Sequence, residues 1–253
     1  MSHWKPVGRM QNLINILGGE EKIACIESGE LVVVERSALA ALSSINNGGI
    51  SPYVSAPVLN IEAFIADWRE FYRQVHSMKV NPPLLKCLPR VTPGFNWGAL
   101  VPKSVKPQRA YEMDQSMFPC WKWCGDRSLD KVIDFTKEAR TADRQSYIVY
   151  CEDSVEPPAR LANTSALQIA ERQVNTLGLT ETLLLHGWFY WKSGGKSNGK
   201  HLDVRNWTLC SASRYSGGSV PGVHWGGSYG ELRVRRCDPG DSDPSVRSRE
   251  AVS

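Results

Sequence analysis

Residues 201–253 read HLDVRNWTLCSASRYSGGSVPGVHWGGSYGELRVRRCDPGDSDPSVRSREAVS, and this stretch decides the fold class. It holds three short apolar runs, at 207–210, 220–225 and 231–236, which are framed by Gly, Ser, Asp and Pro. In the last run apolar residues alternate with arginines, which is the period of a strand with one buried and one exposed face. The stretch therefore predicts a set of short strands joined by Gly-rich turns.

The composition between these runs is typical of an exposed surface. Of the forty residues from Ser211 to Glu250, twenty-four are Ser, Gly, Arg or Asp. Such residues make a poor core, but Ser and Gly adapt to a binding partner and Arg is favoured at recognition hot spots. We therefore expect the strands to display a recognition surface.

Three strings within this region carry a resemblance to a known family: CSASRYSGGSVPGVHW from Cys210, then LRVRRCDP, then the terminal RSREAVS. Together they resemble the C-terminal variable region of proteins that are diversified by diversity-generating retroelements. In that family a reverse transcriptase copies a template with errors at adenines, and the copy replaces the end of the gene. The resemblance spans residues 146–253 and is strongest from Cys210 onward. It implies a C-type-lectin-like domain of the formylglycine-generating-enzyme type.

The distribution of asparagine agrees with this resemblance. The chain has eleven Asn up to Asn206 and none in the 47 residues that follow. Because Asn codons carry two adenines, replacement directed at adenines would remove Asn and leave residues such as Ser, Gly, Arg and Asp. Ordinary variation in loop composition is the alternative explanation.

The expected fold class is α+β, in two parts. Residues 1–144 form a mixed helical and irregular scaffold region, and residues 145–253 form the lectin-like domain with a variable region over 210–253. The resemblance implies two helices plus short antiparallel strands for that domain, and the β-rich run 145–151 is its first strand. Helical spacing of apolar residues predicts helices over 7–17, 58–75, 128–139, 165–177 and 179–191.

The expected ligand contacts are side chains of the variable region that the strand pattern places toward solvent. These are Tyr215, Gly222, His224, Gly227, Ser228, Tyr229, Arg233, Arg235, Arg236 and Asp238. The expected framework consists of residues that the same pattern buries. These are Trp207, Leu209, Val223, Trp225, Leu232 and Val234. Strands fix the backbone, so the exposed side chains can change without unfolding the domain.

Motifs for common enzymes are absent from the sequence. It has no P-loop, no dinucleotide-binding glycine pattern after a strand, no H-E-x-x-H and no G-x-S-x-G elbow. We therefore expect a binding protein and not an enzyme, with no catalytic residues, cofactor or metal. The expected ligand is a protein or another macromolecule. A net charge of +4 is only mildly basic and does not by itself indicate nucleic acid. A membrane partner is not expected either, and the pattern leaves the oligomeric state open.

Two other function classes stay open at this point. The first is an enzyme of the formylglycine-generating kind, which shares the fold and uses a pair of thiols; Cys210 and Cys237 are the candidates. The second is a nucleic-acid-binding protein that uses the stretch 79–109, which contains Lys, Arg and six Pro but no acid. In that reading Phe95 and Trp97 would stack on bases.

The cysteines and the first residues bear on location. The seven cysteines are an odd number, which favours reduced thiols, and MSHWKPVGRM lacks the apolar segment of a secretory signal. We therefore expect a cytoplasmic protein, or a virion-associated one if a phage encodes it. Cys120 and Cys124, in CWKWC, lack the spacing of usual zinc knuckles and are expected to be small buried hydrophobes.

Overall fold

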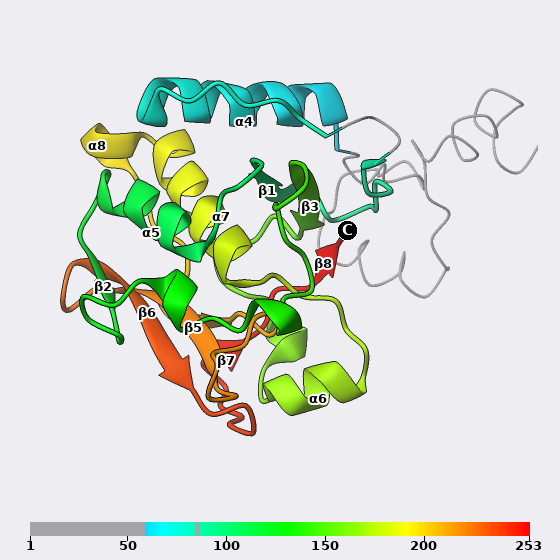
Figure 1. Ribbon diagram of the computed structural model, residues 1–253, viewed down its shortest axis with the longest axis vertical. Helices are drawn as coiled ribbons and strands as arrows, with labels where there is room; N and C mark the ends of the chain where they lie inside the picture. The colour runs from blue at the N-terminus through cyan, green and yellow to red at the C-terminus, as the bar shows by residue number, and fades with distance from the viewer. Residues whose placement is uncertain (1–58, 84–86) are drawn as a thin grey trace, which may run out of the picture. The chain divides into compact units, whose positions relative to one another are not determined.

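Strands on either side of residue 144 pair with each other in the C-terminal part of the chain. The computed structural model describes residues 59–83 and 87–253, and Leu59–Ser253 forms one compact unit (Figure 1). The predicted boundary at 144/145 lies inside this unit. Strand β1 (Trp97–Val101) precedes that boundary and pairs antiparallel along its whole length with β3 (Tyr147–Cys151). The unit therefore begins near Leu59, and the predicted helix over 7–17 lies outside the described residues.

Helix α4 (Ile61–His76) confirms the predicted helix over 58–75. Asn60 caps it, because its side-chain oxygen accepts a hydrogen bond from the backbone N–H of Ala63 at 3.0 Å. The aromatic residues at steps of three and four face inward, and Trp68 is fully buried and stacks on Trp188 with ring centroids 5.7 Å apart. This apolar stripe packs α4 onto the rest of the unit.

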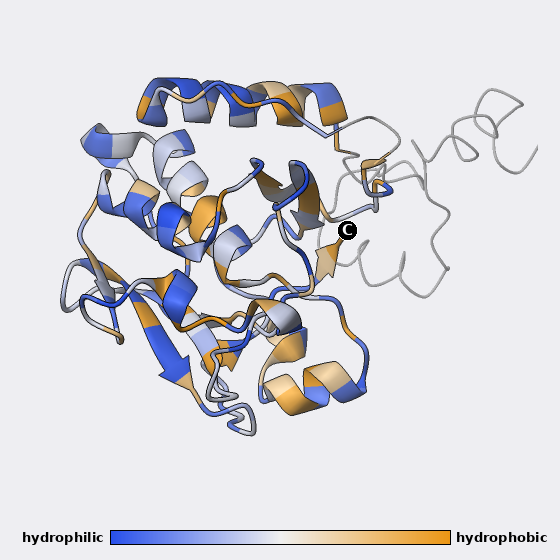
Figure 2. Cartoon of the chain, in the orientation of Figure 1, coloured by the Kyte–Doolittle hydropathy of each residue, from blue (hydrophilic) through white to orange (hydrophobic). Residues whose placement is uncertain are grey.

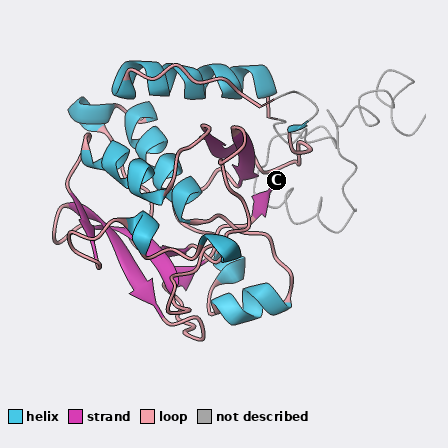
Figure 3. Ribbon diagram, viewed as in Figure 1, coloured by secondary structure: helices cyan, strands magenta, loops and turns pink. Residues whose placement is uncertain are grey.

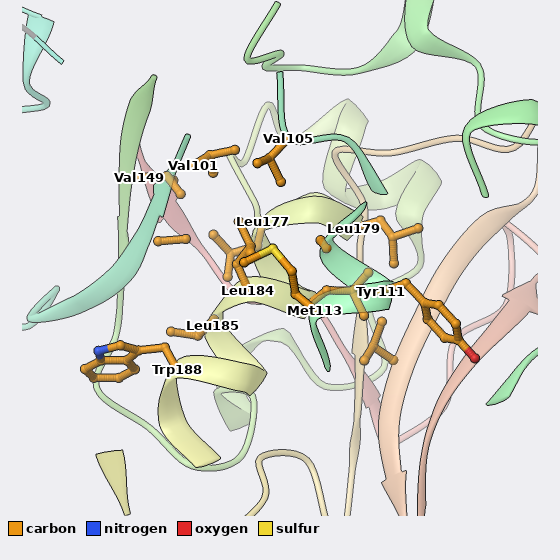
Figure 4. Packing of buried hydrophobic residues seen from close by; sticks show 14 of the residues in the cluster. Val101, Val105, Tyr111, Met113, Val149, Leu177, Leu179, Leu184, Leu185 and Trp188 are labelled. Atoms are coloured by element: carbon orange, nitrogen blue, oxygen red, sulfur yellow. The ribbon is translucent and has the colours of Figure 1, made fainter. Parts of the chain in front are cut away.

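Helix α7 (Leu179–Lys192) is the central helix of the unit and confirms the prediction over 179–191. All its residues from Leu179 to Trp188 are buried, as expected for a helix covered on every side. It contacts α5 (Pro107–Gln115), β1 and β5. Leu184 and Leu185 belong to one buried cluster with valines of the small sheet (Figure 4).

One predicted helix is shorter in the structure, and the prediction of a helix over 128–139 was wrong. Helix α6 (Ala166–Glu171) covers only the first part of 165–177, because Gln173 adopts a left-handed conformation, with φ of 55°, that ends the helix. Residues 128–139 form only two 3₁₀ turns, at Leu129–Lys131 and Phe135–Lys137. Between these turns the backbone pairs with the loop after β4, because Ile133 forms an isolated antiparallel β-bridge with Tyr215. The loop after α7 contains a short helix, α8 (Gly195–Asn198).

The strands form two sheets (Figure 3). The small sheet has the order β1-β3-β8, where β8 is Ala251–Val252, and its strands are mostly apolar (Figure 2). The large sheet contains, in spatial order, β2 (Cys120–Lys122), β6 (Glu231–Cys237), β5 (Val220–Gly226), β4 (Trp207–Leu209) and β7 (Val246–Arg247). The pairs β2–β6 and β4–β7 are parallel, and the other pairs are antiparallel. The three strands predicted in the last third of the chain are thereby confirmed, and the protein is α+β.

A buried ion pair links the last residues of the chain to the large sheet. Arg249 donates hydrogen bonds to Asp203 Oδ1 at 2.5 Å and to Thr208 Oγ1 at 3.0 Å. The same guanidinium donates to the carbonyl oxygens of Ser154 and Val155. Both charged side chains are almost completely buried. This network fixes the segment that leads into β8.

Helix length and composition also bear on membranes. In residues 59–83 and 87–253, no helix combines the length and the apolar composition needed to cross a bilayer. Much of the outer surface of α4 is polar, whereas the middle of α7 is apolar (Figure 2).

Candidate binding surface

One face of the large sheet carries a row of aromatic and cationic side chains. In the strand register, Trp121 of β2 lies opposite Arg233 of β6, which lies opposite His224 of β5. Trp207 of β4 continues the row, because its ring stacks on His224 with centroids 3.8 Å apart and 11° between the planes. The row therefore crosses four strands. We call these four residues, together with Arg235 and Tyr229, the aromatic–arginine row.

Arg233 lies between two aromatic rings. Its guanidinium carbon is 4.4 Å from the ring centre of Trp121 and 4.1 Å from that of Tyr229. Both contacts are at cation–π distance. The rings are themselves accessible, with Tyr229 67% and Trp121 38% exposed, whereas Arg233 is only 9% exposed. The nearest acidic group is Glu231, whose Oε1 is 3.6 Å from Nη1. Arg233 thus presents a cation that is held in place by aromatic rings.

The row contains buried polar atoms that lack a partner among the described residues. Arg235 lies over the ring of Trp207 at 4.8 Å, and its Nε makes no hydrogen bond within 59–83 and 87–253. The same holds for Nε of Arg233 and for Nδ1 of His224. A buried polar group without a partner is costly, and such groups gather where a ligand can supply the missing bonds.

His224 is uncharged at neutral pH. Burial, together with the nearby charges of Arg235 and Arg233, lowers its pKa to about 4. The positive charge of the row therefore comes from the two arginines. Each guanidinium lies over an aromatic ring, and neither makes a hydrogen bond to a carboxylate of the described residues.

The predicted ligand contacts divide into exposed and buried groups. Gly227, Ser228, Tyr229, Arg236 and Asp238 are exposed as expected, and Arg235 is half-buried. The expectation of exposure was wrong for four residues, which are buried: Tyr215, Gly222, His224 and Arg233.

Each of the four has a physical reason for its burial. His224 and Arg233 lie on the outer face as the alternation predicts, but neighbouring rings cover them. A Cβ on Gly222 would come within 2.7 Å of Cys237 Sγ, so this position leaves no room for a side chain. Tyr215 packs edge-on against Trp123, and its hydroxyl donates to the carbonyl of Arg235 at 3.3 Å, which makes it a structural residue.

The expected framework is mostly confirmed. Leu209, Val223, Leu232 and Val234 are buried. Trp207 and Trp225 are only half-buried, because each lies flat on a histidine at the edge of the packed region; the ring centroids of Trp225 and His201 are 3.3 Å apart.

Trp121 is the functional candidate that sequence reasoning missed. Its three-residue strand is too short to give a period, and it precedes the predicted boundary of the domain. The signal that could have found it is the aromatic string CWKWC itself, with a second tryptophan, Trp123, that packs beside Arg236. Cys120 and Cys124 are free thiols, half-buried and buried respectively.

The residues considered for metal or thiol chemistry have other surroundings. No cluster of three His, Cys, Asp or Glu side chains suited to a metal occurs within the described ranges 59–83 and 87–253. Cys210 and Cys237 are both free. Burial raises the pKa of Cys210 above its ordinary value and that of Cys237 to about 11, so both are protonated thiols at neutral pH.

The basic stretch 79–109 does not offer its aromatic residues for stacking. Trp97 packs against Trp188 and Phe189, with ring centroids 5.9 and 5.3 Å away. Phe95 is also packed against the core. Within this stretch, β1 and the start of α5 belong to the folded unit. These contacts count against the alternative in which Phe95 and Trp97 stack on bases, and nucleic-acid binding itself stays untested.

Replacing Tyr229 with alanine is expected to change the free energy of unfolding by less than about 0.5 kcal/mol, because the residue lies in an exposed turn. Trp225→Ala is the matched comparison, with a loss of about 2–4 kcal/mol, since a half-buried ring loses less than a fully buried one. Urea denaturation followed by circular dichroism measures both. A large loss for Tyr229→Ala would show that its contact with Arg233 is structural.

The lowered pKa of His224 predicts that the stability of the protein depends on pH. Because its pKa is about 4 in the folded state and near 6.5 in the unfolded chain, the unfolded state binds a proton more readily between these values. The contribution of neutral His224 to the free energy of unfolding is complete above pH 6.5 and is lost as the pH falls toward 4. A His224→Phe variant keeps a ring on Trp207 but cannot titrate, so its stability should fall less than wild type over this range. Identical pH profiles from urea titrations would contradict this assignment.

The described geometry therefore offers a binding surface built of stacked rings, guanidinium groups and unpartnered donors on a rigid sheet. Chemistry based on an ionised thiol finds no support at neutral pH. A comparison of the chain with protein-family models, curated proteins and solved structures finds no match.

Proposed function

We propose that this protein is a ligand-binding display protein whose C-terminal surface is diversified by a retroelement, and that it acts by binding and not by catalysis. The aromatic–arginine row carries the proposal. It places accessible rings, and buried donors that have no partner among the described residues, on one face of a five-stranded sheet; four of its six residues lie in the region that resembles the variable segment. Such an arrangement suits recognition because the missing hydrogen bonds can come from a ligand.

The arrangement of elements supports a C-type-lectin-like fold for residues 97–253. That resemblance implies two helices with short strands. Between residues 97 and 253 the two longest helices are α5, with nine residues, and α7, with fourteen, and they accompany two sheets; α5 precedes the predicted domain. The terminal strand β8 pairs with β3, so the end of the chain closes the small sheet. The large sheet, in turn, is built mainly from the last third of the chain.

The mechanism that we propose is display on a fixed backbone. Strands β5 and β6 pair over seven residues, and Val223 and Val234 lie opposite each other and are completely buried. The side chains on the other face and in the turn at 227–230 can then vary without loss of the core. Replacement of such residues changes what is bound, while the buried residues preserve the fold.

The experiment that tests this function is sequencing of the genomic DNA that adjoins the gene. We expect a near-copy of the codons for Cys210–Ser253 that differs mainly at adenines of the copy, beside a reverse-transcriptase gene. The equally long stretch of codons for residues 159–202, which includes α7, serves as the control and should have no such copy. If neither a copy nor a reverse transcriptase is present in the complete genome, the proposal is wrong.

A further inference from the structure

We propose that the aromatic–arginine row binds an acidic segment of a partner protein, in which carboxylates at alternate positions of an extended chain contact Arg233 and Arg235. This inference rests on the proposed function, because it names the ligand chemistry of the same surface. It follows from the placement of two guanidinium groups and from their Nε donors, which have no partner among the described residues. It also follows from the arginine and histidine side chains that lie over the rings.

The two arginines are spaced like alternate residues of a strand. Arg233 and Arg235 both belong to β6 and point to the same face, since they lie opposite His224 and Gly222 of β5. The rise of a strand places their Cα atoms about 7 Å apart. An extended segment with acidic residues at every second position has the same spacing. Carboxylates at alternate positions of such a segment therefore match the spacing of the two arginines along the strand.

One donor of each guanidinium group, Nε, lacks an acceptor among the described residues, although Nη1 of Arg233 lies 3.6 Å from Glu231. Nε of each arginine is buried and has no hydrogen-bond partner among residues 59–83 and 87–253. A ring below a guanidinium binds its charge but accepts none of its in-plane N–H groups. A carboxylate has two oxygens in one plane and takes two parallel hydrogen bonds from a guanidinium. This match of geometry favours carboxylates as the ligand groups.

The occupied rings argue against a nucleic acid. A nucleobase needs a free aromatic face on which to stack. The ring of Trp207 has His224 stacked on it and Arg235 over it, and Arg233 lies over the rings of Trp121 and Tyr229. Only the remaining exposed area of the Trp121 and Tyr229 rings is open to a base. A phosphate alone would satisfy the donors, so a test has to compare carboxylates with phosphates directly.

The direct test uses the full chain and four fluorescent probes in an anisotropy titration. The first is a peptide in which Glu alternates with Thr, and the second has the same composition with all Glu in one block. The third replaces Glu with Gln, and the fourth is oligothymidylate. We expect the alternating peptide to bind tightest, at least about threefold tighter than the block peptide. The Gln peptide should show no binding.

Variants assign the binding to the row. Arg235→Gln is expected to weaken binding of the alternating peptide about tenfold, through loss of the bidentate contact. Arg235→Lys keeps the charge but not the fork of donors, and should lie in between. Arg172→Gln removes the same charge from an exposed position at the end of α6 and is the matched control, with unchanged affinity. A thermal melt of each variant verifies that it is folded.

Three results would overturn the inference. These are equal affinity for the alternating and block peptides, tighter binding of oligothymidylate than of either acidic peptide, and equal affinity of the Arg235→Gln and Arg172→Gln variants. Each of them leaves the display function intact if the adjoining DNA holds the predicted copy. Conversely, absence of that copy removes the display function, while spacing-dependent peptide binding would still support an acidic ligand for this surface.

Discussion

Replacement of Arg249 by methionine is expected to lower the free energy of unfolding by about 3–5 kcal/mol. Arg249 and Asp203 are both almost fully buried, and their ion pair has an N···O distance of 2.5 Å. Methionine keeps most of the volume but removes the charge, so Asp203 is left as a buried acid without its cation. The carbonyl oxygens of Ser154 and Val155 lose their donors in the same change.

A second substitution separates the charge from the hydrogen bonds. In an Arg249→Met, Asp203→Asn double variant neither side of this pair carries a charge, so we expect part of the loss to be recovered. Arg172→Met, at the exposed end of α6, is the control and should change stability by less than about 0.5 kcal/mol. Urea denaturation measures all three. A loss below about 1 kcal/mol for Arg249→Met would contradict the structural role of this pair.

The second large effect concerns α4. Trp68→Ala is expected to cost about 3–5 kcal/mol, because Trp68 has no exposed surface and contacts four aromatic side chains. This result would place α4 within the C-terminal unit energetically as well as geometrically. If α4 were only a tether, its loss of packing would leave the unfolding of the sheets unchanged.

A neighbouring residue provides the control for this experiment. Arg69 follows Trp68 in the same helix but is exposed, so Arg69→Ala should stay within about 0.5 kcal/mol of wild type. Circular dichroism is the suitable signal, because removal of a tryptophan changes the fluorescence itself. Equal stability of Trp68→Ala and Arg69→Ala would show that α4 does not stabilise the unit.

Local patterns were sufficient to predict part of the fold. The aromatic residues of α4 recur at helical steps, and the alternation in β6 marks a strand; both patterns act within a few residues of the chain. The start of α4 could also be predicted, because asparagine is a preferred N-cap residue and Asn60 precedes the helix. Elements of this kind need no knowledge of the partners against which they pack.

Long-range contacts explain what the sequence did not reveal. Arg233 is on the outer face as predicted, yet it is buried because Trp121, far away in the chain, joins the sheet beside it. The proline-rich stretch before α5 has the composition of a linker, but β1 within it pairs with β3. Strands of two or three residues, such as β2 and β7, carry too few residues to show a period.

The most direct test of display on a fixed framework is sequencing of the end of this gene in many copies from one population. The proposed function predicts amino-acid changes at exposed or half-buried positions such as Tyr229, Arg235 and Arg236. It predicts none at the buried Val223, Leu232 and Val234. Changes spread evenly over both groups, or no excess of changes over the rest of the gene, would contradict the proposal.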